Sequence, residues 1–245
     1  MKEQVRGNGG FWSALRRGGM PSAIASVLGA PTAQQMAFIR QLTREQRRSE
    51  SLRVPLKELE TVVFDLETTG FSAQHGDEIL SFGAVRVVGD TIVEKEQFYS
   101  LVNPNTDIPP HISELTGITQ EMTTDAPALI DALHDFMSFV GGSVLVAHAS
   151  SHDKSFLNAA LWKTSKVQLT HRVIDTMMLA RWLEPQPGNY NLDDLLLSNG
   201  IPIQGRHHAL EDALMTAQLW VLYMQELMER DVMNLADLYN QLSHA

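Results

Sequence analysis

The sequence has 245 residues, a formal net charge of −10 and no cysteine. This length suits one well-buried domain, and a hydrophobic fraction of 44% excludes a wholly disordered chain. The lack of cysteine excludes disulfides, zinc–thiolate sites and thiol nucleophiles.

The charges are divided unevenly along the chain. Residues 1–60 contain ten Lys/Arg and five Asp/Glu, whereas residues 61–245 contain nine Lys/Arg and 24 Asp/Glu. A basic segment therefore precedes a strongly acidic one. The acidic part by itself argues against a nucleic-acid partner, because contacts to phosphate need lysine and arginine.

No segment of the sequence has the pattern of a membrane span or a signal peptide. The longest uncharged run, Gly18 to Ile39, contains Pro21 and Pro31 and many small polar residues. It lacks the ~20 predominantly apolar residues of a spanning helix and the compact apolar core of a signal peptide. We therefore expect no membrane association and a cytoplasmic location.

Residues 1–55 are expected to form a basic N-terminal extension. Its first part is rich in glycine, which disfavours fixed structure. A short helix is predicted after Thr32, the candidate N-cap, because Met36, Ile39 and Leu42 are spaced along one helix face. This helix has two interpretations: it lies on the domain as a solvated amphipathic helix, or it contacts nucleic acid or a partner.

Residues 56–245 are expected to form a single α/β domain. Buried or half-buried strands are predicted at 61–66, 78–88, 91–102, 143–147 and 172–174. Helices are predicted at 126–140, 151–163, 176–183, 191–198 and 209–229. Hairpin-connected strands followed by alternating helices and strands indicate one mixed sheet flanked by helices.

The first candidate site is Asp65-Leu66-Glu67-Thr68-Thr69-Gly70, at the end of the first predicted strand. On a strand Asp65 and Glu67 point to the same face. Neighbouring carboxylates raise each other's pKa unless a cation lies between them. The alternative is that the strand has ended and both side chains are solvated, but the apolar run before them favours a functional role.

The second candidate is Asp153, near the start of a predicted helix. Phe156 and Leu157 lie three and four residues further on, so the carboxylate shares their core-facing side. A structural interpretation is equally available, since Ser150 and Asp153 have the spacing of a capping box. Acidic residues are also favoured in a first helical turn.

The third candidate is the stretch from His207 to Ala213. Asp212 lies near the start of an apolar helix. His207 is five residues earlier and cannot share the helix face of Asp212. We therefore expect His207 on the preceding loop, where it either reaches over the same site or is an ordinary polar surface residue.

These three stretches, in this order, resemble the DEDD-type 3′–5′ exonucleases. Within them the sequence is similar to the subclass with a histidine five positions before the last aspartate (DEDDh), of which the proofreading epsilon subunit of bacterial DNA polymerase III is the best-known relative. The resemblance covers about residues 60–228. The middle motif departs from the family's His-Asn-x-x-Phe-Asp, because Ala149 and His152 replace the Asn and the Phe.

The resemblance implies a ribonuclease H-like fold and a hydrolase that uses two Mg²⁺ or Mn²⁺ ions. Hard divalent cations prefer such oxygen ligands. By this resemblance Asp65 is the ligand shared by both ions. Glu67 and Asp212 are ligands on the side of the attacking water, and Asp153 supports the other ion. His207 is the expected general base, a role that histidine performs near neutral pH.

The expected substrate contacts are less sharply defined. They are Thr68, Thr69, Gly70, Leu115, Thr116 and His148. The expected reaction is removal of nucleoside 5′-monophosphates from the 3′ end of DNA, single-stranded or frayed, in proofreading or repair. A DNA polymerase acting in trans is a possible partner of this activity. The acidic body favours a grip on the terminal nucleotide or two, with any long-range attraction coming from residues 1–60.

Alternative functions stay open at this point. The protein could be a 3′–5′ exoribonuclease or oligoribonuclease, which only contacts to the 2′-hydroxyl would distinguish. A non-catalytic, polymerase-associated subunit that binds nucleic acid is an alternative of another class. The presence of all four carboxylates and the histidine disfavours it. The basic extension could dock a polymerase or nucleic acid in either case.

Overall fold

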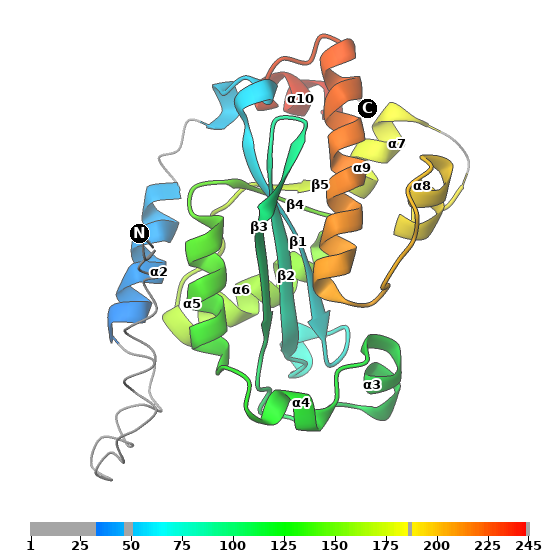
Figure 1. Ribbon diagram of the computed structural model, residues 1–245. Helices are drawn as coiled ribbons and strands as arrows, with labels where there is room; N and C mark the ends of the chain where they lie inside the picture. The colour runs from blue at the N-terminus through cyan, green and yellow to red at the C-terminus, as the bar shows by residue number, and fades with distance from the viewer. Residues whose placement is uncertain (1–32, 47–50, 186–187, 244–245) are drawn as a thin grey trace, which may run out of the picture. The chain divides into compact units, whose positions relative to one another are not determined.

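A computed structural model describes residues 33–46, 51–185 and 188–243. Its centre is a five-stranded mixed sheet with the strand order β3-β2-β1-β4-β5 (Figure 1). The strands are β1 (Glu60–Thr68), β2 (Ile79–Val88), β3 (Thr91–Leu101), β4 (Val144–Ala147) and β5 (Val173–Asp175). β1 pairs antiparallel with β2 and parallel with β4. β3 is antiparallel to β2, and β5 is parallel to β4.

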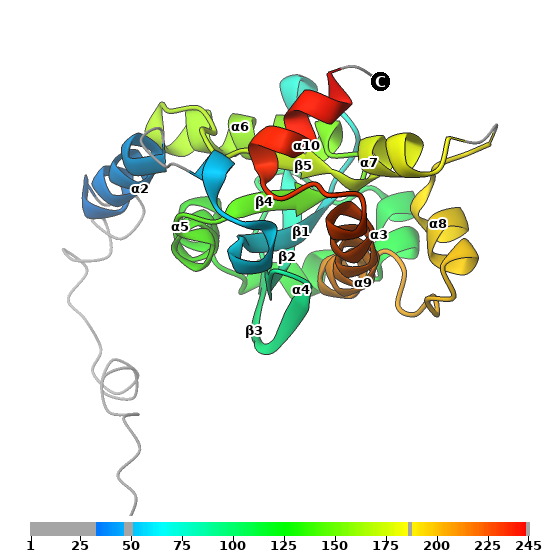
Figure 2. The same cartoon turned by 90° about the horizontal axis from the view of Figure 1, so that it is seen from above.

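Helices cover both faces of the sheet (Figure 2). One face packs against α7 (Thr176–Leu183), α8 (Leu192–Ser198) and the long α9 (Ala209–Glu229), with α10 (Leu235–Leu242) completing that core. The other face packs against α5 (Leu129–Val140) and α6 (Ser151–Ser165). The helix α2 (Ala33–Gln46) contacts α5 and α6. The short helices α3 (Pro110–Thr116) and α4 (Gln120–Thr124) follow β3.

The long helix α9 is the main support of β1 and β2. It lies across both strands, and it also contacts β3. Trp220 is fully buried, and its indole N–H donates to the hydroxyl of Thr61 at 3.1 Å. A buried indole needs such a partner for its N–H, so this bond fixes α9 over the first strand.

The predicted mixed α/β sheet is confirmed, with every predicted strand present. The helices α3, α4 and α10, of seven, five and eight residues, were not predicted. Thr32, the predicted N-cap, lies outside the described residues. The domain boundary at residue 55 stays a prediction. In the described part, α2 belongs to the compact unit Ala33–Ala245 and buries Ile39.

Among the residues that the structure describes, no helix combines the length and apolarity needed to cross a membrane.

Candidate active site

Two of the predicted site residues lie on β1, on the face that α9 covers. Phe64 and Leu66 enter the core beneath α5 and α6, whereas Val63 enters the core beneath α9. Because successive strand residues point to opposite faces, Asp65 and Glu67 share the side of Val63. Glu67 is buried, and Asp65 is half-buried.

The start of α9 rests directly on β2 at Gly83, the register partner of Asp65. A Cβ built on Gly83 would lie 2.1 Å from the carbonyl carbon of Ala209. Only glycine allows so close an approach of helix and sheet. The approach brings Asp212 to β1, where Asp65, Glu67 and Asp212 have ligand oxygens within 4.8 Å of one another.

A second contact, between two aromatic rings, holds the start of α9. The ring of His208, the N-cap residue, stacks on Tyr99 of β3 with a centroid distance of 4.6 Å and an interplanar angle of 17°. The first turn of α9 therefore has a contact on β2 and another on β3. Both contacts help to set the position of the Asp212 carboxylate relative to β1.

His207 lies on the loop before α9, as the spacing predicted. Its backbone has a φ of +62°, and its N–H donates to Oδ2 of Asp212 at 2.9 Å. The neighbouring Arg206 contacts Oδ1 of Asp212 through Nη1, and its Nε donates to Oδ1 of Asp193 at 2.6 Å. Both oxygens of Asp212 thus have partners on the same loop, which orients the carboxylate.

Asp153 lies in the first turn of α6 and is buried. It is outside the group of three clustered carboxylates, but its charge acts on Asp65. The turn before α6 is held by Asp175, whose carboxylate accepts the N–H groups of Ala149 at 3.1 Å and Ser150 at 2.8 Å. Asp175 therefore determines where α6 begins, and with it the position of Asp153.

Burial and mutual repulsion raise the pKa of three of these carboxyls. Burial raises the pKa of Asp65 well above its ordinary value, and the charges of Asp153 and Glu67 add to the effect. Burial raises the pKa of Glu67 to about 8, with a further contribution from the charge of Asp212. The pKa of Asp153 is raised to about 7, again mainly by burial. Arg206 acts in the opposite direction on Asp65 and Glu67.

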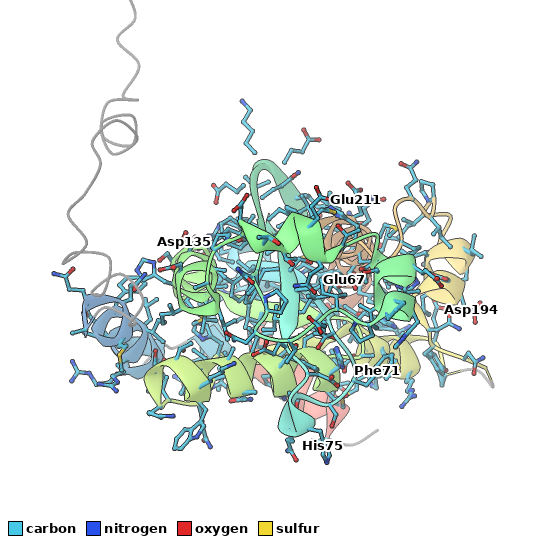
Figure 3. The ribbon with its side chains drawn as sticks, turned by 90° about the horizontal axis from the view of Figure 1, so that it is seen from below. Glu67, Phe71, His75, Asp135, Asp194 and Glu211 are labelled. Atoms are coloured by element: carbon cyan, nitrogen blue, oxygen red, sulfur yellow. The ribbon has the colours of Figure 1, made fainter. Side chains whose placement is uncertain are left out.

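A cleft of about 600 Å³ opens over the carboxylates. Asp65, Glu67, Asp212, His207 and His148 line it. The opposite wall comes from α7 and from the loop before α8, through Met177, Arg181, Asn189, Tyr190 and Asn191. Phe71 lies at the rim and is 83% exposed. Figure 3 labels Glu67 and Phe71 in a view of the molecule from below.

Thr68, Thr69 and Gly70, which were predicted to contact substrate, form hydrogen bonds within the turn that follows β1. The hydroxyl of Thr68 donates to the carbonyl of Gly70 at 2.6 Å, and the hydroxyl of Thr69 accepts the N–H of Glu78 at 2.9 Å. Thr68 also lies 3.3 Å from Nε2 of His152. These bonds stabilise the turn, and a contact between these residues and substrate stays a prediction.

Leu115 and Thr116 lie on α3, outside the lining of the cleft. Leu115 is 46% exposed, whereas the hydroxyl of Thr116 donates to the carbonyl of Ile112 at 2.9 Å. His148 does line the cleft, with Nδ1 2.9 Å from the hydroxyl of Thr176. The roles of these three residues in substrate binding stay predictions as well.

Comparison with known proteins agrees with this geometry. A family model described as exonuclease (RNase T) matches residues 62–220, which include all but the first two residues of the sheet and all of the candidate residues. The chain belongs to this exonuclease family. The chain is 38% identical over 181 residues to a protein from Oceanobacillus iheyensis named DNA polymerase III PolC-type. The match covers 74% of this chain and 12% of that protein. The chain thus corresponds to a small part of its curated relatives.

Solved structures have the same fold as this chain. A structure titled Exonuclease X in complex with 5′ overhanging duplex DNA is 27% identical, with a TM-score of 0.56. It covers 69% of this chain and 92% of that one. The nuclease domain of 3′hExo, titled a DEDDh family member bound to rAMP, is 23% identical with a TM-score of 0.60, and covers 68% and 92% of the two chains. The ribonuclease H-like fold that the motifs implied is thereby confirmed.

Arg206 is the functional-site residue that sequence reasoning missed. It is adjacent to His207 in the sequence, so its proximity to the site was available, but its direction depends on the loop conformation. The wall residues before α8 were also missed. Nothing in their spacing indicates that a loop 16 to 18 residues before His207 would line the same cleft as Asp65.

Proposed function

We propose that the exonuclease removes nucleotides from the 3′ end of DNA, with the histidine-subclass arrangement of Asp65, Glu67, Asp153, His207 and Asp212. The observation that carries the proposal is the buried cluster of Asp65, Glu67 and Asp212 beside His207 at the base of an open cleft. The similarity to a DNA polymerase III supports DNA as substrate.

The donor set fits divalent cations of the magnesium type. All three clustered ligands are carboxylates, which suits Mg²⁺ or Mn²⁺ and disfavours softer metals. We propose two ions, with Asp65 shared and Asp153 supporting the second ion. Bound ions supply Lewis-acid stabilisation of the charge that develops on the phosphate. The raised pKa values mean that cation binding displaces protons from these carboxyls.

His207 is proposed as the general base that accepts a proton from the attacking water. His207 lines the cleft, and its backbone N–H is bonded to Asp212. The base and a proposed ligand are therefore held by one short loop. Their relative position is set before substrate enters, which is the condition for efficient proton transfer.

The rest of the cleft suits a terminal nucleotide. Asn189 offers an amide group for hydrogen bonds, and Arg181 offers a positive charge. Phe71 offers an exposed aromatic face at the rim. Aromatic faces stack on bases of any identity, so these residues fit a nuclease with little sequence preference.

The decisive experiment follows the degradation of 5′-labelled oligonucleotides with Mg²⁺ or Mn²⁺. Matched single-stranded DNA, duplex DNA and RNA report direction, strandedness and sugar preference together. We expect shortening from the 3′ end of DNA, with nucleoside 5′-monophosphates as products. Efficient degradation of RNA alone would instead establish an exoribonuclease or oligoribonuclease.

Two variants test the assignment of residues. We expect Asp65→Asn to abolish hydrolysis and His207→Ala to slow it about 10²- to 10⁴-fold, the usual contribution of a general base. The exposed Asp107 and His111 supply the control variants Asp107→Asn and His111→Ala, which should retain full activity. Full activity in Asp65→Asn would refute the proposed catalytic site, whereas a wild-type protein that binds but does not hydrolyse any of these substrates would favour a non-catalytic binding subunit.

The similarity to part of a DNA polymerase III also supports a role beside a polymerase. We therefore propose proofreading or repair in association with a polymerase as the setting of the reaction. Faster removal of a mismatched than of a matched 3′ nucleotide would support it. The cytoplasmic location expected from the sequence belongs to this proposal.

A further inference from the structure

The acidic part of the chain contains one basic stretch. Between Asp153 and Asp175 there is no acidic residue, and Lys154, Lys163, Lys166 and Arg172 lie there. These are four of the nine Lys/Arg after residue 60, within a segment that contains most of α6. Residues 61–245 carry a net negative charge that repels a polyanion. This repulsion should be weaker at the surface formed by residues 154–174, where the charged side chains are all basic.

Two hollows lie along this stretch. One, of about 390 Å³, is lined by Arg40 and Arg44 of α2 and by Trp162 and Lys166 of the α6 end. The other, of about 630 Å³, is lined by Ser155, Asn158 and Trp162 of α6 and by Gln74. Trp162 lines both, so the two hollows adjoin each other at its side chain, and no carboxylate lines either one.

The second hollow leads toward the cleft. His152 and Phe71 line the cleft, and their rings lie 6.0 Å apart. Ser155 is one helical turn beyond His152 on α6, and Gln74 lies three residues beyond Phe71. Cleft and hollows thus follow one another along the exposed side of α6. We call this series, from Gln74 and Ser155 to Trp162, Lys166 and the two arginines of α2, the α6 surface.

The side chains of the α6 surface suit a single-stranded nucleic acid. Trp162 is 57% exposed, so one side of its indole is available for a base. Lys166 lies over the same indole, with Nζ 5.6 Å from the ring centroid. Arg40 is held in place because its Nε donates to the carbonyl of Ser165 at 3.0 Å. An aromatic platform among cations is the usual construction of single-strand binding sites.

We propose that the α6 surface binds the part of a single strand that lies 5′ of the nucleotide in the cleft. This inference rests on the proposed nuclease function for its orientation. From His152 to Trp162 the helix rises about 15 Å, and at the 3.4 Å per nucleotide of a stacked strand this corresponds to roughly four nucleotides. Substrates shorter than that do not reach Trp162 or Lys166.

The binding test uses the full chain in EDTA, so that no hydrolysis occurs, with fluorescein-labelled oligothymidylate of about 12 nucleotides. Trp162→Ala should weaken binding at least about fivefold, which corresponds to the loss of one stacked base. Lys166→Asn should reduce the slope of log K against log salt by about 0.7, as expected for one phosphate contact. Asparagine is chosen because residue 166 has a φ of +56°, which asparagine tolerates.

Lys95→Asn is the matched control. Lys95 is exposed on the edge strand β3 and lines neither hollow, so its loss should leave affinity and salt slope unchanged. A matching oligouridylate distinguishes RNA from DNA as the bound strand. Equal affinity and equal salt slope in the wild type, Trp162→Ala and Lys166→Asn would overturn the proposal, whether or not the protein hydrolyses DNA.

Hydrolysis gives an independent readout. We expect Trp162→Ala to raise the KM for the longer oligonucleotide at least about fivefold and to leave its kcat unchanged. The KM for a dinucleotide should not change, because a dinucleotide ends before Trp162. An equal change of KM for both substrates would contradict binding along α6. If no nucleic acid is hydrolysed, the proposed function fails, while the EDTA experiment still decides the binding inference.

Discussion

Gly83 on β2 and Ala209 in the first turn of α9 are in direct backbone contact. A Cβ on Gly83 would lie 2.1 Å from the carbonyl carbon of Ala209. Gly83 is also the partner of Asp65 in the β1–β2 ladder. This one contact therefore sets the separation between the helix that carries Asp212 and the strand that carries Asp65.

We predict that Gly83→Ala displaces α9 and damages the site as well as the fold. Overpacking of this kind costs about 1–3 kcal/mol of unfolding free energy, and a displaced Asp212 should lower cation affinity and nuclease activity. Urea unfolding and calorimetric titration with Mn²⁺ measure the two effects. Gly188→Ala, at a position with nothing within 4 Å of the added Cβ, should leave the unfolding free energy unchanged. Wild-type stability in Gly83→Ala would show that the helix can shift at no cost.

A second prediction concerns the strained turn before α6. Ala149 has a φ of +49°, a conformation that costs a residue with a Cβ roughly 1–2 kcal/mol. Ala149→Gly should therefore raise the unfolding free energy by about 0.5–1 kcal/mol. The same substitution within α6, Ala159→Gly, should lower it by about 1 kcal/mol. Denaturant unfolding of both variants measures these changes. If both substitutions lowered the unfolding free energy, the result would contradict strain at Ala149.

The Asp175 carboxylate should matter for activity even though it lies behind the site. Asp175→Ala leaves the N–H groups of Ala149 and Ser150 without their acceptor, at a cost of about 1–3 kcal/mol for each buried group. It also frees the start of α6, which carries Asp153. We expect reduced thermal stability and a lower rate of hydrolysis. A comparably destabilised variant outside the cleft, such as Leu238→Ala in the core beneath α10, should retain its rate once it is folded.

The raised pKa values predict how stability depends on pH without metal. The pKa of Glu67 is about 8 in the folded protein, whereas the ordinary value for a glutamate, which applies to the unfolded chain, is 4.5. A group whose pKa is raised on folding contributes stability that is full below its unfolded pKa and is lost as pH rises through its folded pKa. This contribution of Glu67 should therefore decline between about pH 4.5 and pH 8 in EDTA. Glu67→Gln should make the decline shallower.

Divalent cations should reverse this loss of stability. Mn²⁺ binds the deprotonated carboxylates and competes with protons. The rise of Tm on adding Mn²⁺ should thus be larger above pH 8 than near pH 6. Thermal unfolding in EDTA and in Mn²⁺ at both pH values measures it. A larger rise at the lower pH would contradict the assignment of these carboxyls as ligands.

Arg206 should weaken cation binding, because its guanidinium adds a positive charge beside Asp212 and bonds to it. We expect Arg206→Gln to tighten Mn²⁺ binding roughly three- to tenfold, the effect of one nearby unit charge after screening by solvent. Isothermal titration calorimetry measures the affinity. Arg181→Gln, on the opposite wall of the cleft, is the control and should have a smaller effect. Weaker binding in Arg206→Gln would mean that its role is to orient Asp212.

The elements of the fold were largely predictable because they are encoded locally. The run from Thr61 to Leu66 is apolar and β-branched, and it forms β1 between two cores. The turn at Gly89-Asp90 and the helix over 209–229 carry equally direct signals. The helix α3 escaped prediction because only Ile112 of its seven residues is buried, so it has no apolar stripe, whereas the equally short α8 buries three leucines.

The sequence by itself determined that Asp65 and Glu67 share one face, since strand geometry requires it, and that His207 precedes the helix of Asp212. Tertiary structure alone decided that Asp212 reaches Asp65, because this depends on the packing of α9 against Gly83 across more than 120 residues of chain. It also decided that Arg206 faces Asp212 and that a basic, aromatic side lies along α6 in an acidic protein. Local conformation follows from neighbouring residues, whereas the field at a site is the sum over charges that only packing brings together.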